Sequence, residues 1–210
     1  MLQFKQVEKY YGKHLALSIP TLDVQKGLYW VQGENGSGKT TLLKMVAGLH
    51  PFKGEIYRDQ INIKKERTLF LRGVNYAEAE PLYPTFLTAK DLVTLYCGTR
   101  KVATTKALEQ LEQLHISHAY QQEIGTYSSG MIKKLSLVLA FIGNPSWIML
   151  DEPLITMDVA AVDTVSNWIN QLVEQAQVSF LITSHQLFQT PLNFTGNIQV
   201  ANQSLSYAEL

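Results

Sequence analysis

A glycine-rich segment that ends in lysine and threonine is the strongest chemical signal in this sequence. Residues 33–41 read GENGSGKTT, so Gly33, Gly38, Lys39 and Thr40 have the spacing of a phosphate-binding loop. Glycines let backbone amides turn inward around phosphate oxygens, and a following helix adds the partial positive charge of its N-terminus. Lys39 would neutralise the β- and γ-phosphates of a nucleotide, and the Thr40 hydroxyl would bind Mg²⁺.

Two carboxylates follow a short apolar run later in the chain. Residues 147–150 read WIML and predict a buried strand, with Asp151 and Glu152 at its carboxyl end. Open α/β sheets bind ligands at that end, so Asp151 would hold Mg²⁺ through water and Glu152 would orient or deprotonate an attacking water. A second apolar run, 178–182, precedes His185. We expect its strand to lie beside the first, which would bring His185 to the same edge.

The elements that position these residues alternate between strand and helix patterns. Apolar and aromatic runs predict strands, and 3.6-residue periodicity predicts helices. We expect strands at 2–10, 15–19, 27–32, 68–71, 147–150 and 178–182, a hairpin at 55–63, helices after residue 39 and at 159–175, and two short strands in the tail. Two helical patterns opened by threonine, and a third helix at 129–142, place a helical lobe at about 77–145.

This alternation predicts one α/β domain over residues 1–210. Its core, about 1–76 and 146–210, would be a P-loop NTPase core with a mainly parallel sheet. An antiparallel β part would precede that sheet. The helical lobe would be inserted into the α/β core.

Composition restricts the class of protein further. Of 210 residues, 46% are hydrophobic, and 18 basic residues balance 18 acidic ones, which argues against a protein that coats nucleic acid. Cys97 is the single cysteine, so no intrachain disulfide forms and a reducing, cytoplasmic setting fits. The most apolar stretch, 135–143, is too short to span a membrane. We therefore expect any link to a membrane to come through a partner.

Taken together, these segments resemble the ATP-binding subunit of ABC transporters over nearly the whole chain. The glycine loop is similar to the family's Walker A loop, and IMLDEP, 148–153, is similar to its Walker B motif with Glu152 as the catalytic glutamate. His185 in LITSH resembles the switch histidine, and residues 157–158 resemble the D-loop. YSSGM, 127–131, stands before the helix that leads to Walker B, where the family carries its LSGGQ signature.

The resemblance implies a role for each matching residue. Glu152 and His185 would be catalytic, and Thr40 and Asp151 would hold Mg²⁺. Tyr11 looks like the aromatic that stacks on adenine, with Tyr10 as the rival. The remaining ATP contacts would come from Gly33, Asn35, Gly36, Ser37, Gly38, Lys39, Thr40, Thr41, Ser128 and Gly130. In the family, the last two complete the site of a second subunit, so we expect a dimer of this chain with itself or a related chain.

Two features depart from the family pattern. In the signature, Ser129 replaces the first glycine and Met131 replaces glutamine, while Ser128 and Gly130 are kept. The same segment also reads as a capped helix start, and both interpretations can hold, because a capped N-terminus is itself an anion site. The glutamine of the Q-loop is not evident, and Glu78 stands near its place. Glu78 would either bind Mg²⁺ or be a solvated loop acid.

The resemblance implies ATP hydrolysis that powers a separate membrane permease, with the chain peripheral on the cytoplasmic face of the membrane. The Y-S-x-G-M form of the signature resembles the signatures of exporters more than those of importers. The segment 78–88, with Leu82, Tyr83 and Phe86, would either receive the permease or pack within the lobe. The alternatives are a non-transport ABC ATPase and a small P-loop kinase. A kinase would need an arginine-rich lid for its second substrate, and Arg100 is the single arginine in residues 99–135.

Overall fold

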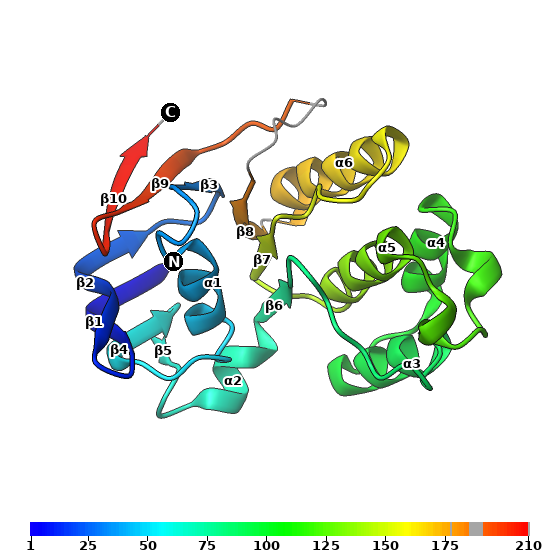
Figure 1. Ribbon diagram of the computed structural model, residues 1–210, viewed down its shortest axis with the longest axis horizontal. Coiled ribbons are helices and arrows are strands. Elements are labelled where there is room, and N and C mark those ends of the chain that lie inside the picture. Colours follow the sequence, from blue (N-terminus) through cyan, green and yellow to red (C-terminus); the bar gives the residue numbers. More distant parts are fainter. Residues whose placement is uncertain (177, 185–190, 210) are drawn as a thin grey trace.

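The computed structural model describes residues 1–176, 178–184 and 191–209, and it divides into a core with two sheets and a helical lobe (Figure 1). The first sheet is antiparallel, with the strand order β2-β1-β4-β5. Its strands are β1 (Leu2–Tyr11), β2 (His14–Val24), β4 (Lys53–Arg58) and β5 (Ile61–Asn62). The expected N-terminal antiparallel part is confirmed.

The second sheet carries the proposed chemistry and has the strand order β10-β9-β3-β8-β7-β6. Its strands are β3 (Leu28–Gln32), β6 (Val74–Ala77), β7 (Trp147–Asp151), β8 (Ser179–Thr183), β9 (Gly196–Ala201) and β10 (Ser204–Glu209). All pairs are parallel except β9 with β10. β3, β8 and β7 are neighbouring parallel strands, so their carboxyl ends lie at the same edge of the sheet. The glycine loop after β3 and the acids after β7 therefore lie at that edge.

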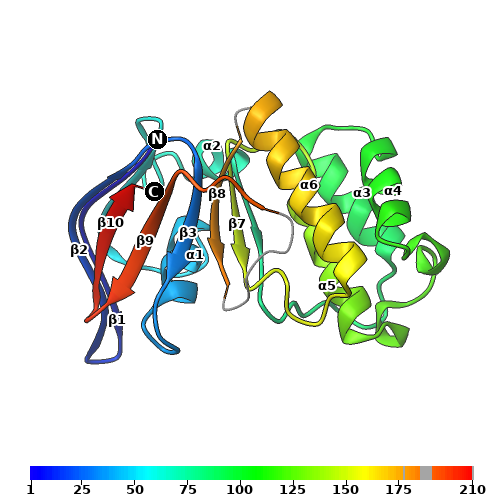
Figure 2. The same ribbon diagram turned by 90° about the horizontal axis from the view of Figure 1, so that it is seen from above.

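Helices cover both faces of the second sheet (Figure 2). On one face, α1 (Lys39–Val46) packs between the two sheets and buries Leu42, Leu43, Met45 and Val46. On the other face, α5 (Ser129–Ala140) and α6 (Val159–Ala176) join a second apolar cluster that continues into the lobe. The two clusters hold the sheet rigidly, which fixes the edge where the loops after its strands meet.

The lobe is built from helices that polar residues begin, as the sequence predicts. It contains α3 (Ala89–Arg100), α4 (Thr105–Gln113), α5 and two 3-10 turns, η1 (Ser117–Ala119) and η2 (Ile124–Thr126). Thr88 opens α3 with a capping box, because its Oγ1 accepts from the Asp91 amide at 3.1 Å while Asp91 accepts from the Thr88 amide at 2.9 Å.

The strand predicted at 68–71 is wrong, since these residues form α2 (Arg67–Arg72). A short, mainly apolar run such as TLFL fits a strand or a buried helix turn equally well. Here only Phe70 is buried, Leu69 faces outward, and Arg58 donates to the Phe70 and Leu69 carbonyl oxygens at 3.1 and 2.9 Å. The next element, β6, was not predicted. It forms because it pairs with β7 along its whole length.

No helix in the described part of the chain is both long and apolar enough to cross a bilayer.

Candidate active site

The loop between β3 and α1 requires glycine at several positions. A Cβ atom on Gly33 would lie 2.3 Å from the Val200 carbonyl oxygen, which no side chain tolerates. Gly36 and Gly38 have φ angles of +79° and +111°, in the region that favours glycine. Among the described residues, α1 has no side-chain cap and no acid in its first turn. Its first amides are therefore available to an anion.

Lys39 places a cation on this loop. Its side chain is only 8% exposed, and its Nζ donates to the carbonyl oxygens of Gly33 at 2.7 Å and Glu34 at 3.0 Å. A buried ammonium group needs such partners, because burial removes its water. The loop thus brings a lysine cation and the N-terminus of α1 to one place, which is the chemistry that binds phosphate.

Asp151 ends β7 as a buried carboxylate held by two hydroxyl groups. It is 1% exposed, and it accepts from Thr183 Oγ1 at 2.7 Å and from the Tyr76 hydroxyl at 3.2 Å. Burial raises the pKa of Tyr76 far above its usual value, and the nearby Asp151 carboxylate raises it further. Tyr76 therefore stays a neutral donor, and the three residues form a fixed network across β6, β7 and β8.

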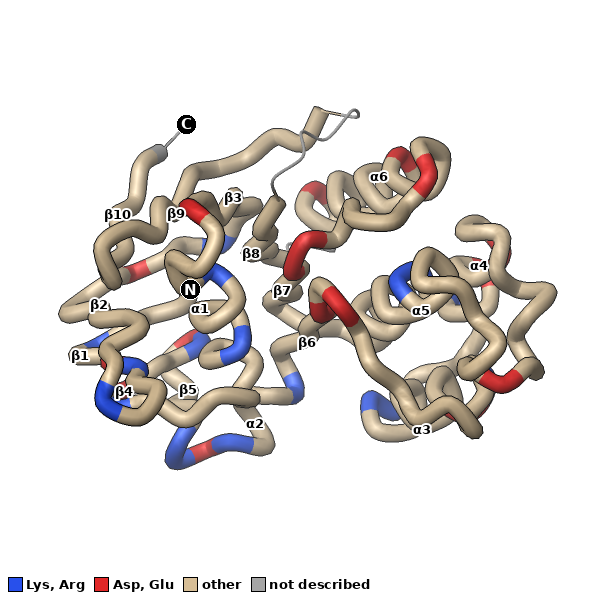
Figure 3. The backbone as a smooth tube through the Cα atoms, viewed as in Figure 1, with Lys and Arg blue, Asp and Glu red and all other residues tan. Residues whose placement is uncertain are grey.

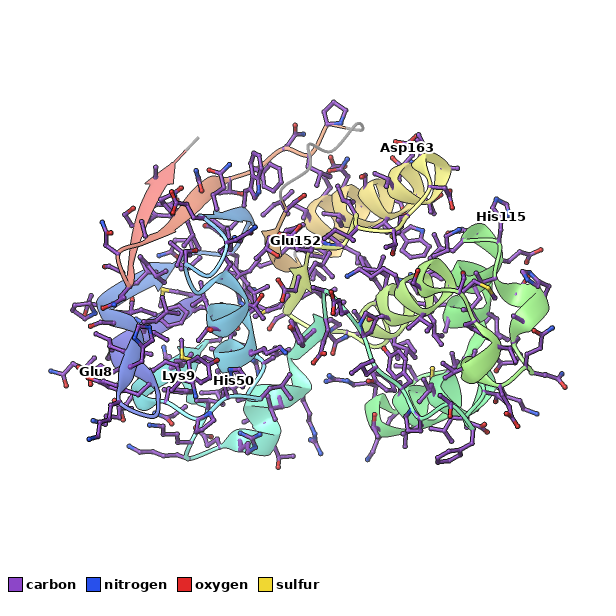
Figure 4. The ribbon with its side chains drawn as sticks, viewed as in Figure 1. Glu8, Lys9, His50, His115, Glu152 and Asp163 are labelled. Atoms are coloured by element: carbon purple, nitrogen blue, oxygen red, sulfur yellow. The ribbon has the colours of Figure 1, made fainter. Side chains whose placement is uncertain are left out.

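Glu152 follows directly in a strained backbone conformation. Its φ is +46°, in the left-handed region that residues with a Cβ seldom adopt, and its backbone amide donates to Thr183 Oγ1 at 2.8 Å. Figure 4 places Glu152 at the end of β7, on the side of the core that faces the lobe. Strain of this kind persists where the surrounding structure holds it, and it concentrates at functional sites.

One cavity joins the glycine loop to these acids. It measures about 410 Å³, a size common for small-molecule sites. Its lining consists of Asn35, Gly36, Gly38, Lys39, Thr40, Thr41, Asp151, Glu152 and Ile155. Residues more than a hundred positions apart in sequence therefore share one space, with a cation on one wall and two carboxylates on another.

Tyr11 lies beside the first turn of α1. Its hydroxyl is 3.3 Å from Thr41 Oγ1 and 2.9 Å from His50 Nδ1, and its ring is half exposed. Each tyrosine ring has a lysine over it: Lys53 Nζ is 4.9 Å from the Tyr10 centroid and Lys9 Nζ is 4.6 Å from the Tyr11 centroid, but only Tyr11 contacts Thr41. Of the two tyrosines, Tyr11 is therefore the one beside the phosphate loop.

Ser128 and Gly130 lie on α5, away from the lining of this cavity. Ser128 caps the helix, and its Oγ accepts from the Met131 amide at 3.2 Å. The hydroxyl hydrogen is still able to donate to another group. A Cβ atom on Gly130 would lie 3.0 Å from the Thr156 carbonyl oxygen, so a larger residue would press on the loop between β7 and α6. The fold does not bring these residues to Lys39 of the same chain.

The structure does not bring the Glu78 carboxylate to this cavity either. Glu78 lies 3.8 Å from Lys44 and lines a different cavity, between core and lobe. Within the described residues, no three His, Cys, Asp or Glu side chains gather into a metal site. The predicted switch residue, His185, lies outside the described residues.

The model of the ABC transporter family matches residues 18–155. This range includes the glycine loop, the signature segment and both acids. The chain belongs to the ABC transporter family. The match confirms the family proposed from the motifs, and with it the P-loop core.

ABC transporter relatives share a quarter to a third of their aligned residues with this chain. ABC transporter A family member 2 of Dictyostelium discoideum is 30% identical over 89% of this chain and 12% of its own length. The linearmycin resistance ATP-binding protein of Bacillus subtilis is 28% identical over 89% and 62%. The bacitracin transport ATP-binding protein of Bacillus licheniformis is 26% identical over the same shares. The chain thus spans less than two thirds of each relative.

Solved ABC cassettes share the fold. An ATP-binding subunit of an ABC transporter superimposes with a TM-score of 0.88 at 20% identity, over 100% of this chain and 90% of that one. A dimeric ATP-binding cassette in a post-hydrolysis state with ADP and Pi gives a TM-score of 0.85 at 19% identity, over 100% and 99%. These likenesses confirm the predicted ABC architecture.

Three residues of the site were not found from sequence. Tyr76 lies on β6, the strand that sequence patterns did not indicate. Thr183 was noticed only as part of the motif before His185, and its hydroxyl holds both Asp151 and the Glu152 amide. Lys133 is a buried lysine in an amphipathic helix, where a lysine is expected to face water. No local pattern reveals a bond to a distant strand.

Proposed function

We propose that this chain binds and hydrolyses ATP and so powers transport through a separate membrane permease. One observation carries the proposal: a single cavity joins a phosphate-binding loop to two carboxylates. The loop supplies charge stabilisation for the transferred phosphoryl group, and the acids supply metal binding and water activation.

The phosphate chain would bind along the loop. The free amides at the start of α1 and the Lys39 ammonium group would hold the β- and γ-phosphate oxygens. To reach them, Lys39 would exchange its carbonyl partners for phosphate. The Tyr11 hydroxyl lies 3.3 Å from Thr41, a residue of the cavity lining, and its half-exposed ring would stack on the adenine base.

The donor set in this cavity fits Mg²⁺. The Thr40 hydroxyl and the Asp151 carboxylate are hard oxygen ligands, and both line the cavity. Thr40 would bind the ion directly and Asp151 through water, while Thr183 and Tyr76 keep the carboxylate oriented. When bound, Mg²⁺ neutralises charge that develops on the phosphate oxygens.

Glu152 would orient and deprotonate the attacking water. It is nearly buried, and its backbone is held by the hydrogen bond to Thr183. A carboxylate held in one direction is an effective general base, because correct geometry removes most of the entropic cost. His185 stays the predicted second catalytic residue, beside the γ-phosphate.

The working unit would be a dimer. Ser128 and Gly130 stand at the N-terminus of α5 but outside the cavity of their own chain. A second copy, or a related chain, could present the same surface to the γ-phosphate. Closure would then depend on ATP, and hydrolysis would release it.

The permease would dock in the groove between core and lobe. This groove measures about 430 Å³, and its lining includes Leu49, Glu78, Leu82 and Tyr96. Leu82 is 91% exposed and Phe86 72% exposed, while Tyr83 packs on the lobe core. Exposed apolar side chains around a groove favour a protein partner.

Replacement of Lys39 by alanine tests ATP binding and hydrolysis. The change should abolish turnover and weaken nucleotide binding, because a charge-assisted phosphate contact contributes about 1.5–3 kcal/mol. The measurement is the Mg-ATPase rate together with the affinity for a fluorescent ATP analogue. Wild-type values in a folded Lys39→Ala variant would refute the proposed site.

Charge substitution of the exposed residue Leu82 tests the permease groove. Leu82→Glu should leave the basal ATPase rate of the isolated chain unchanged and abolish co-purification with the proposed permease. Lys90→Glu, at an exposed position of α3, is the control and should co-purify normally. Equal co-purification of both variants would remove the groove from the interface.

A further inference from the structure

Lys133 on α5 is a buried lysine that reaches from the lobe into the core. Its side chain is 1% exposed. Its Nζ donates to three backbone carbonyl oxygens, those of Glu78 at 2.7 Å, Ala79 at 3.0 Å and Asp151 at 3.0 Å. An ammonium group has three hydrogens, so every donor of Lys133 has an acceptor.

The three acceptors belong to segments beside the proposed catalytic acids. Glu78 and Ala79 follow β6 directly and begin the connection to the lobe, while Asp151 ends β7. Four carboxylates surround the ammonium group electrostatically, Asp151 and Glu152 from β7 and Glu78 and Glu80 from the connection. Figure 3 shows acidic positions after β6 and after β7, where the core meets the lobe, and basic positions on α5.

The peptide group between Asp151 and Glu152 is held from both sides. Lys133 Nζ binds its carbonyl oxygen at 3.0 Å, and Thr183 Oγ1 binds its amide at 2.8 Å. The next torsion along the chain is the φ of Glu152, at the strained value of +46°. Since both ends of this peptide are fixed, the direction in which the Glu152 side chain leaves the backbone is fixed as well.

We propose that Lys133 is a positioning residue, which clamps the Asp151–Glu152 peptide and thereby aims the Glu152 carboxylate at the attacking water. The inference rests on the proposed ATPase function and deepens it. Burial of an ammonium group is costly, so a lysine retained only for packing would be a poor choice at this position. The clamp gives the cation a use that an apolar side chain cannot supply.

Lys133→Met tests the clamp, with Lys90→Met as the matched control at an exposed position. Methionine keeps the length of the side chain and removes its donors. In Lys133→Met, kcat should fall at least about tenfold while the affinity for ATP stays within about twofold, because misplacement of a reacting group acts on the chemical step. Lys90→Met should keep the wild-type kcat. Wild-type kcat in a folded Lys133→Met would overturn the proposal.

Hydrogen exchange separates this inference from the proposed function. A wild-type chain without Mg-ATPase activity would refute the function. The clamp itself is tested by amide exchange at Glu152 and residues 78–80, measured by mass spectrometry without nucleotide. Exchange should be faster in Lys133→Met and unchanged in Lys90→Met. Equal exchange in both variants would overturn the clamp whatever the activity of the chain.

A folding defect in Lys133→Met is controlled by a second variant. Lys133→Gln keeps an N–H donor and a polar end, and it should fold with an intermediate kcat. A folded Lys133→Gln with wild-type kcat would likewise overturn the proposal.

Discussion

Replacement of Thr183 by valine removes one hydroxyl group and keeps nearly the same shape. Thr183 is fully buried, and its hydroxyl both accepts from the Glu152 amide at 2.8 Å and donates to Asp151 Oδ1 at 2.7 Å. Valine would leave the buried amide without this acceptor, and it would remove one of the two hydroxyl donors that hold the Asp151 carboxylate.

The structure sets the size of this effect. An unsatisfied buried donor costs about 1–3 kcal/mol, and a hydrogen bond to a charged group contributes about 1.5–3 kcal/mol. We therefore expect a loss of about 3 kcal/mol in the free energy of unfolding. For a chain of this size that corresponds to a fall in Tm of about 6–12 °C. In addition kcat should fall at least about tenfold, because the peptide between Asp151 and Glu152 loses one of the two hydrogen bonds that fix it.

Thr183→Ser is the matched control for this prediction. Serine keeps the hydroxyl and loses one methyl group, which costs about 1 kcal/mol in a core. Differential scanning calorimetry and steady-state ATPase assays of both variants give the comparison. If valine and serine lower Tm equally and leave kcat equal, the two hydrogen bonds of Thr183 do not hold the acids in place.

Three other substitutions test the remaining parts of the site. Glu152→Gln keeps the size of the side chain but removes the base, so hydrolysis should slow by about 10²-fold or more. The unhydrolysed ATP should hold a dimer that light scattering detects, and a wild-type rate would exclude Glu152. Tyr11→Ala should raise the Kd for ATP without lowering the saturated rate, because stacking acts alike on ground and transition states; a fall in kcat alone would give Tyr11 another role. Ser128→Arg should prevent dimer formation in the Glu152→Gln background while the affinity of the monomer for ATP is kept, and a normal dimer would refute the shared site.

The segments that sequence predicted well have local causes. The glycine loop depends on backbone angles that only glycine adopts easily, so its residue types and spacing predict it. The helix starts at Thr88 and Ser128 depend on a side chain and an amide three residues away. The strand 147–150 is buried on both faces, and such strands read as continuous apolar runs. These signals, taken together with the resemblance, predicted the α/β fold and the family, and both are confirmed.

Other features arise from contacts between distant segments. The run 68–71 is helical, and Arg58 donates to the carbonyl oxygens of Phe70 and Leu69 in that helix. β6 is a strand because its backbone pairs with β7. For Glu78 the sequence left a metal ligand and a solvated loop acid open, and the structure places its carboxylate beside Lys44 in another cavity. Each outcome is decided by partners far along the chain, and a local window does not contain them.

The sequence by itself determined which residues could do chemistry, because the residue types and their spacing carry that information. Tertiary structure alone decided how the acids are held. Lys133 from α5 and Thr183 from β8 meet at one peptide group at the end of β7, and they lie 18 and 31 residues from their partners in that peptide. Only the packing of the lobe and the order of the parallel strands bring them within hydrogen-bond distance. Such a distance depends on the whole fold, and therefore no local pattern of residues contains it.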